Sequence, residues 1–167
     1  MGEWDVSDEG RFSACYRATF AEVYRYAGIL CGPDRRDAED LVQEVYLAAL
    51  RKARDGTLTS LSTGYLITSL RHRRLDRLRH DRREMRRLEL VAATVDDVDQ
   101  QLDERSRDEL ARLSDLPARE RAAMVLRFVD ALAVAEVAEE MGIGLRAAES
   151  LLARATRRLR RQEARDA

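Results

Sequence analysis

The residues from Gly64 to Arg87 combine a dense set of cationic side chains with few acidic ones. This stretch holds nine arginines and two histidines against three acidic residues. Arginine guanidinium groups match the geometry of phosphate oxygens and stack on exposed bases. The composition therefore predicts contact with a nucleic-acid backbone, and a solvated charged surface is the alternative interpretation.

A helix is the element that would position these cations. The apolar residues of the stretch lie three, four, five or seven positions apart, within roughly half of a helical wheel at about 100° per residue. One face would then pack against the protein while the other carries the arginines. The residues expected to pack are Leu66, Leu70, Leu75, Leu78, Met85 and Leu88.

The composition of the chain is typical of a soluble helical protein. Of 167 residues, 45% are hydrophobic, 37% charged and 5% aromatic, and two are prolines. No apolar run approaches the roughly 18 residues of a membrane span and the N-terminus is acidic, so we expect a cytoplasmic protein without membrane insertion. Cys15 and Cys31 are too far apart along one expected helix to bridge within it, which predicts buried free thiols.

Two helices are expected before the basic stretch. Residues 11–31 carry apolar side chains at steps of three and four, and Gly32 and Pro33 end the pattern. Asp34 is placed to cap a second helix that ends near Asp55. The expected buried residues are Phe12, Tyr16, Phe20, Val23, Ala27 and Leu30 in the first helix and Ala38, Leu41, Val42, Val45, Ala49 and Leu50 in the second.

The second helix has a distinctive exposed side. On a helical wheel, four residues lie within about 100° of one another and away from the buried residues. We name this set the acidic ledge: Asp40, Gln43, Glu44 and Leu47. The acidic ledge is either solvated surface or a docking site for a basic partner helix.

Two segments lack a regular apolar pattern. Residues 55–63 are mostly small and polar, with a glycine and three threonines, and are expected to form an exposed loop before the basic helix. Residues 89–109 hold eight acidic residues and two arginines, which is too polar for a core and indicates a linker. We therefore expect one domain over residues 1–90, an acidic linker over 91–112 and a second domain over 113–167.

The second domain contains the most specific pattern in the sequence. Ala138 lets two helices approach, Gly142 allows a sharp turn and Ile143 fills the angle between the helices, as in a helix-turn-helix. The other apolar positions of this pattern are Val137, Met141, Ala148 and Leu151. A generic helical hairpin is the alternative, because the same spacings suit a short antiparallel pair.

In a helix-turn-helix, the N-terminal part of the second helix reads base edges in the DNA major groove. Here that part offers Arg146, Ala147, Glu149 and Ser150. Glu149 would repel phosphates and suits a cytosine amino group or a pairing with Arg146. The residues expected to hold phosphates follow it: Arg154, Arg157, Arg158, Arg160 and Arg161.

These parts occur in an order that resembles a known family. The motifs are DAEDLVQEVYLAAL at residues 37–50, LDRLR at residues 75–79 and LPARERAAMVLRFVDALAVAEVAEEMGI at residues 116–143. The chain resembles a bacterial RNA polymerase sigma factor of the two-domain, extracytoplasmic-function type over nearly its whole length. The resemblance implies an all-α fold, with an N-terminal helical bundle and a C-terminal helix-turn-helix domain joined by the acidic linker.

The resemblance also implies partners and site residues. The acidic ledge would dock on the clamp helices of the polymerase largest subunit, and the flap region is a further contact. The −10 element would be engaged by Thr57, Thr59, Ser60, Tyr65, Arg71, His72, Arg74, Arg77 and Arg79, with the loop at residues 55–63 capturing a flipped base. The −35 element would be engaged by Arg146, Ala147, Glu149, Ser150, Arg154, Arg157 and Arg158. An anti-sigma protein is a common partner in this family, and no cofactor, metal or small-molecule substrate is implied.

Several positions depart from the family pattern. Tyr65 stands where relatives usually have tryptophan and His72 where asparagine is common, which indicates an unusual −10 preference. Glu149, Leu151 and Ala153 replace the lysine, arginine and histidine often found at the matching positions. These replacements weaken the expected −35 contact.

Three other classes of function are open to such a sequence. A stand-alone helix-turn-helix regulator, whose N-terminal half is a dimerisation or effector domain, would bind its promoter without core polymerase. A protein that only sequesters partners would bind core polymerase tightly without starting transcription. An enzyme is disfavoured, because His72 and His80 lie eight positions apart with no nearby nucleophile, glycine-rich phosphate loop or metal-ligand spacing. The sequence therefore predicts a specificity subunit that is not itself an enzyme.

Overall fold

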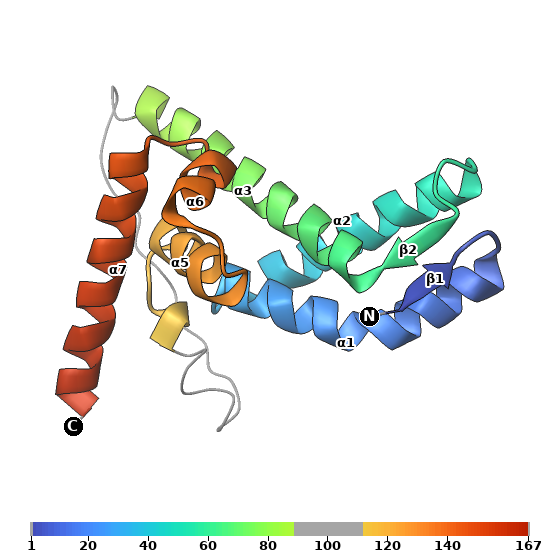
Figure 1. Cartoon of the computed structure of the whole chain (residues 1–167), viewed down its shortest axis with the longest axis horizontal. Helices are drawn as coiled ribbons and strands as arrows, with labels where there is room; N and C mark the ends of the chain where they lie inside the picture. The colour runs from blue at the N-terminus through green and yellow to red at the C-terminus, as the bar shows by residue number, and fades with distance from the viewer. Residues whose placement is uncertain (1, 89–111, 167) are drawn as a thin grey trace. The chain divides into compact units, whose positions relative to one another are not determined.

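The computed structural model describes residues 2–88 and 112–166 and is almost entirely helical (Figure 1). The elements are β1 (Glu3–Asp5), α1 (Glu9–Cys31), α2 (Arg35–Arg54), β2 (Ser60–Ser62), α3 (Thr63–Leu88), α5 (Ala118–Met124), the π-helix η1 (Val125–Val129), α6 (Val134–Met141) and α7 (Leu145–Asp166). This confirms the predicted all-α class.

The described residues divide into two compact units. The first unit comprises residues 2–28 and 34–73, and the second comprises residues 29–33, 74–88 and 112–166. The helix α3 therefore contributes residues to both units. The predicted acidic linker at residues 91–112 lies outside the described residues except for Arg112.

The helices α1 and α2 form where the sequence pattern predicts them. Asp34 is the N-cap of α2 and its side chain accepts a hydrogen bond from the Asp37 backbone N–H at 3.1 Å. The predicted apolar residues of α2 are buried except for the half-buried Leu50. In α1 the prediction is only partly correct: Cys15 is buried as predicted, but Tyr16 is 39% exposed, and Thr19 and Tyr26 are buried.

A short antiparallel sheet was not predicted. β1 pairs with β2, with Glu3 opposite Ser62, Trp4 opposite Leu61 and Asp5 opposite Ser60. Figure 1 shows the two strands side by side where α1 begins and α2 ends. The segment at residues 55–63 is therefore an exposed loop only in its first part, since Leu61 and Thr63 are buried.

The helices of the second unit include the predicted helix-turn-helix. Val137, Ala138, Met141, Ala148 and Leu151 are all buried, and α6 ends at Gly142, whose φ of +60° is readily adopted only by glycine. The Ile143 backbone N–H donates to the Ala138 carbonyl at 3.0 Å, which closes the turn.

The helices α5 and α7 share an apolar cluster, made by Leu116, Met124 and Ala155 with the partly buried Leu113, Leu152 and Leu159. Phe128 is 67% exposed in η1. A π-helix has a different number of residues per turn from an α-helix, so it rotates the side chains that follow it.

Candidate functional surfaces

The acidic ledge lies on the solvent side of α2. Asp40, Gln43 and Glu44 are exposed, and Leu47 is a large apolar residue that is 48% exposed. Glu44 lies 3.7 Å from the Arg73 guanidinium of α3, and both side chains are well exposed, so solvent screens this ion pair. The structure thus brings the four predicted residues together on one accessible face.

A groove between α1 and α2 adjoins the acidic ledge. Its volume is about 620 Å³, and Gln43 and Leu47 belong to both the groove and the ledge. We name this the aromatic groove, because it is lined by Phe12, Tyr16, Phe20 and Tyr24 of α1 and by Glu39, Val42, Gln43, Tyr46, Leu47 and Leu50 of α2. The accessible face of the first unit is therefore acidic along one side and apolar along the other.

Neighbouring aromatic rings of the groove contact one another in pairs. The ring centroids of Tyr16 and Phe20 are 5.2 Å apart, those of Phe20 and Tyr24 are 5.6 Å apart, and Tyr16 meets Tyr46 edge-on at 4.8 Å. Such separations are favourable for aromatic pairs. Sequence reasoning assigned Tyr16 and Phe20 to the core, because aromatic residues at helical spacing are more often buried than aligned along a groove.

A hydrogen-bond chain orients Tyr46 in the groove wall. The Thr19 hydroxyl donates to the Cys15 carbonyl at 2.8 Å, so its single proton is used there and the Tyr46 hydroxyl donates to the Thr19 Oγ1 at 2.8 Å. Burial raises the pKa of Tyr46 to about 12 and also raises the pKa of the Cys15 thiol. Both groups are therefore uncharged at neutral pH.

We define the α2–α3 loop as residues 55–62. Its first half is held by hydrogen bonds to the end of α2 and by bonds within the loop. The Leu58 backbone N–H donates to the Lys52 carbonyl at 3.0 Å. The Asp55 carboxylate accepts from the Thr57 hydroxyl at 2.5 Å and from the Thr57 backbone N–H at 2.9 Å. These two bonds, the hydroxyl bond first, lower the pKa of Asp55. Thr57 and Thr59, two of the predicted site residues, are exposed.

The second half of this loop is tied to the N-terminal segment. The Val6 backbone N–H donates to the Thr59 carbonyl at 3.0 Å, and Ser60 Oγ donates to Glu3 Oε1 at 2.5 Å. A third predicted site residue, Ser60, is thus already hydrogen-bonded within the first unit. Sequence reasoning missed this contact because three-residue strands carry no recognisable alternation.

The predicted basic residues of α3 differ in accessibility. Tyr65 is 36% exposed and its hydroxyl accepts from Lys52 Nζ at 3.1 Å, while His72 is exposed and Arg71 and Arg77 are half-buried. Arg74 is only 8% exposed, and Arg79 Nη1 donates to Asp76 Oδ1 at 2.5 Å. Arg74 is therefore not placed to reach a DNA backbone. The helical-wheel argument could not detect this, because arginine can bury its long aliphatic stem.

The N-terminal part of α7 presents the predicted reading residues to solvent. Arg146, Ala147, Glu149 and Ser150 are all exposed, and Ser150 Oγ donates to the Arg146 carbonyl at 2.8 Å. Leu145, which sequence reasoning did not select, is 50% exposed at the start of the same helix. The accessible surface of this part is more apolar than the sequence pattern alone suggested.

Two of the predicted phosphate-binding arginines are held by a buried carboxylate. Glu120 of α5 has a side chain only 7% exposed, and its oxygens lie 3.4 Å from Arg154 Nε and 3.0 Å from Arg158 Nε of α7. We name these three residues the Glu120 clamp. Its negative charge offsets part of the positive charge of both arginines. Arg157, also in α7, is exposed.

Neither a membrane-spanning helix nor a metal-binding cluster is found in the described part of the chain. Within residues 2–88 and 112–166, each helix is too short or too polar to cross a lipid bilayer. In the same ranges, His, Cys, Asp and Glu side chains do not gather in groups of three or more that could hold a metal ion. Cys15 and Cys31 are buried free cysteines.

Comparison with known proteins shows the family to which these surfaces belong. The sequence profile of Sigma-70 region 2 matches residues 12–84, which include the acidic ledge, the α2–α3 loop and most of α3. The profile of Sigma-70, region 4 matches residues 102–159, which include α5, α6 and most of α7. The chain belongs to the sigma-70 family. These two matches confirm the resemblance to a two-domain sigma factor that the motifs indicated.

The relatives support this assignment over part of their length. RNA polymerase sigma factor SigF of Mycobacterium tuberculosis, in strains CDC 1551 / Oshkosh and ATCC 25618 / H37Rv, is 40% identical over 74 residues. This alignment covers 43% of the present sigma-70 chain and 28% of SigF. The chain therefore matches less than a third of the length of these relatives.

A solved sigma factor structure shares the fold of this sigma-70 chain. Sigma factor RpoE from Bartonella quintana, crystallised in complex with the anti-sigma factor NepR, has a TM-score of 0.51 at 23% identity, covering 90% of this chain and 94% of RpoE. CnrH, solved in complex with the cytosolic domain of CnrY, has a TM-score of 0.47 at 18% identity, covering 97% and 94% of the two chains.

Proposed function

We propose that this chain is a sigma subunit that binds core RNA polymerase and directs promoter-specific initiation of transcription. The observation that carries the proposal is the presence of an accessible acidic and apolar face in the region 2 match and of a helix-turn-helix in the region 4 match. A stand-alone regulator would instead use the first surface for dimerisation or for binding an effector. The proposal assigns no catalytic step to this chain.

The acidic ledge is the proposed contact with the polymerase clamp helices. Asp40 and Glu44 supply charge that complements a basic helix, and Leu47 supplies an apolar contact that is half-exposed in the free chain. The flap region of polymerase is the proposed contact of the second unit. An anti-sigma protein is a further proposed partner, since RpoE, which has the same fold, is bound to one.

The −10 element is assigned to the α2–α3 loop and the exposed side of α3. The residues retained for this role are Thr57, Thr59, Ser60, Tyr65, Arg71, His72 and Arg77. Hydroxyls and a tyrosine ring can hold an unstacked base, and arginines can hold the single-stranded backbone. Arg74 and Arg79 are left out of direct contact, because one is buried and the other is paired with Asp76.

The −35 element is assigned to the N-terminal part of α7. Arg146, Ala147, Glu149 and Ser150 are retained as reading residues, and Arg157 is retained as a phosphate contact. Arg154 and Arg158 act mainly on Glu120 and therefore contribute less to DNA affinity than their charge suggests. Weak −35 reading would place more of the promoter specificity in the −10 contacts.

A gel-shift series with and without core polymerase tests this proposal against a stand-alone regulator. The proposal predicts that the isolated chain gives no promoter-specific shift, whereas chain plus core polymerase gives a specific shift that excess non-promoter DNA does not remove. An equally specific shift by the isolated chain would favour the stand-alone regulator. Because phosphate contacts depend steeply on salt, both arms must be run at the same ionic strength.

A further inference from the structure

The N-terminal strand has a position that the proposed function does not explain. β1 is outside the region 2 match, which begins at residue 12, yet it pairs with the part of the loop that leads into α3. Together with the bond from the Val6 N–H to the Thr59 carbonyl, this pairing places every residue from 59 to 62 beside the N-terminal segment. The second half of the loop is therefore supported from outside the family motif.

A two-stranded sheet of three residues per strand is marginally stable in water unless other contacts hold it. Here Leu61 of β2 and Val6, which directly follows β1, are both only 1% exposed, so buried apolar side chains hold both segments in the core of the first unit. The bond between Ser60 and Glu3 then joins the loop to the strand through side chains. Backbone pairing, buried apolar residues and a side-chain bond thus act on the same short segment.

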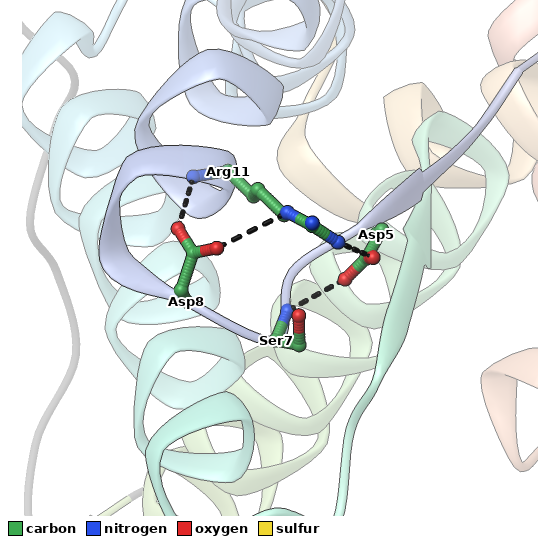
Figure 2. A network of polar contacts seen from close by, with 4 residues as sticks. All are labelled: Asp5, Ser7, Asp8 and Arg11. Carbon is green, nitrogen blue, oxygen red and sulfur yellow. Dashed lines mark hydrogen bonds and ion pairs between the residues drawn. The ribbon is translucent and has the colours of Figure 1, made fainter.

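A polar network joins the other end of β1 to the first turn of α1 (Figure 2). Asp5 Oδ1 accepts from the Ser7 backbone N–H at 2.9 Å, and Asp5 Oδ2 accepts from the Arg11 guanidinium. Asp8 accepts from the Arg11 backbone N–H at 2.9 Å and lies 3.1 Å from Arg11 Nε. Figure 2 shows Arg11 extended between the two carboxylates, so Asp5 couples the strand to a rigid helix.

We propose that β1 is a brace that sets the conformation of the α2–α3 loop for capture of the −10 base, with Glu3 and Asp5 as positioning residues. The inference rests on the proposed function of this loop. Fixing the backbone of a flexible loop costs conformational entropy, and a loop that is ordered beforehand does not lose this entropy on binding. The brace therefore favours base capture without touching the DNA.

Removing the side chains of Glu3 and Asp5 should change promoter opening in opposite directions if they act as charges or as a brace. Both side chains are acidic and exposed, close to a loop assigned to DNA. If they acted only through their charge, their removal would reduce repulsion and strengthen promoter opening. If they act as a brace, their removal weakens promoter opening despite the gain in positive charge.

The test compares three double variants in holoenzyme on a promoter selected by the wild-type chain. Glu3→Ala with Asp5→Ala removes both acceptors, whereas Glu3→Gln with Asp5→Asn removes the charges and keeps an acceptor oxygen at each position. Glu9→Ala with Glu22→Ala is the charge-matched control, since Glu9 makes only a 3.6 Å exposed contact with Arg54 and Glu22 is exposed on α1. Promoter opening is followed by a fluorescent base at the melted −10 position.

The brace predicts that the alanine pair reduces the opening constant about tenfold while the affinity for core polymerase stays within about twofold. Hydrogen exchange of the backbone amides at residues 59–62 should become about tenfold faster in that variant. The amide pair and the control pair should match the wild type in both measurements. The exchange measurement separates a loosened loop from a merely altered DNA contact.

Unchanged or improved opening by the alanine pair would overturn the inference while leaving the proposed function intact. So would a loss of opening by the alanine pair without faster exchange at residues 59–62, because the loop would then not have loosened. A wild-type chain that opens no promoter would overturn the proposed function itself, before any variant is compared. Each failure is therefore distinguishable from the other.

Discussion

Single side chains decide which arginines are available to DNA. The Glu120 clamp uses a carboxylate that is nearly inaccessible to solvent to hold two arginines that are each about half-exposed. A buried carboxylate is costly unless cations or hydrogen-bond donors compensate it. Arg154 and Arg158 therefore serve the packing of α5 against α7 before they serve any external partner.

Replacement of the clamp residue should test this structural role. Glu120→Gln keeps the side-chain shape and removes the charge, so we expect the free energy of unfolding to fall by about 1–3 kcal/mol. The matched control is Glu163→Gln, since Glu163 lies 3.1 Å from Arg112 with both side chains about half-exposed. The control should cost less than about 1 kcal/mol. Urea unfolding measures both changes, and equal losses would contradict the clamp.

Tyr46 should make the first unit sensitive to alkaline pH. Its pKa is raised from 10.0 to about 12 by burial, so the unfolded chain releases this proton before the folded chain does. The stabilising contribution to the free energy of unfolding is complete below pH 10 and is lost as the pH rises toward 12. At pH 11 the loss amounts to about 1 kcal/mol. Urea unfolding between pH 8 and pH 11 measures the effect. Tyr46→Phe should remove that part of the pH dependence, and an unaltered profile would show that Tyr46 ionises normally.

At the scale of the elements, α2 joins two kinds of surface. The acidic ledge and the aromatic groove share Gln43 and Leu47, so one face of the helix offers charge and the adjacent face offers aromatic rings. A partner helix seated on this face would meet both at once. The affinity of such an interface depends on a few apolar anchors, while its charges determine orientation and the rate of association.

Charge reversal on the acidic ledge should weaken the binding of core polymerase. Glu44→Lys places a cation where a basic partner helix is expected, and we predict about tenfold lower affinity without loss of fold. Glu22→Lys makes the same charge change at an exposed position of α1 that does not line the groove, and should alter the affinity less than about twofold. Fluorescence anisotropy with labelled chain measures both. Equal effects of the two variants would exclude the ledge from the interface.

The turn between α6 and α7 depends on one glycine. Gly142 has φ +60° and no side chain to strain this conformation, whereas Gly144, two residues later, has open space around its Cβ position and an ordinary φ. Gly142→Ala should therefore lower the free energy of unfolding by roughly 1 kcal/mol, with Gly144→Ala within about 0.5 kcal/mol of the wild type. Thermal unfolding followed by circular dichroism checks the difference, which should vanish if the turn relaxes freely.

The sequence correctly predicts the elements that depend on residues close together in the chain. Helices α1 and α2, the Asp34 cap and the turn at Gly142 follow from the period of apolar residues and from the properties of single residue types. β1 and β2 were missed, because each is three residues long and is stabilised only by a partner distant in the sequence.

The sequence likewise predicted only part of the candidate surfaces. All four residues of the acidic ledge are accessible, as the helical wheel requires, but the aromatic groove beside them was not foreseen. Charge alone predicted arginines facing DNA, whereas Arg74 is buried and the Glu120 clamp holds two others. A long cation can pack or pair, and composition does not distinguish these outcomes.

The charge of the whole molecule bears on how it meets DNA. The chain has 30 basic and 31 acidic residues, with two histidines, and a formal net charge of −1 at pH 7. Such a chain has no general attraction to a polyanion, unlike proteins that bind DNA by neutralising many phosphates. We therefore expect specific DNA binding to require polymerase, which orients the local cationic surfaces toward the promoter.

Run-off transcription with purified core polymerase, the chain and a promoter library tests the proposed function most directly. The proposed function predicts transcripts that appear only when the chain is present, that start at a common distance from shared −10 and −35 sequences, and that decline with Glu44→Lys. If no template gives a transcript that depends on the chain, although the chain is folded and the core polymerase is active, the proposed function is wrong.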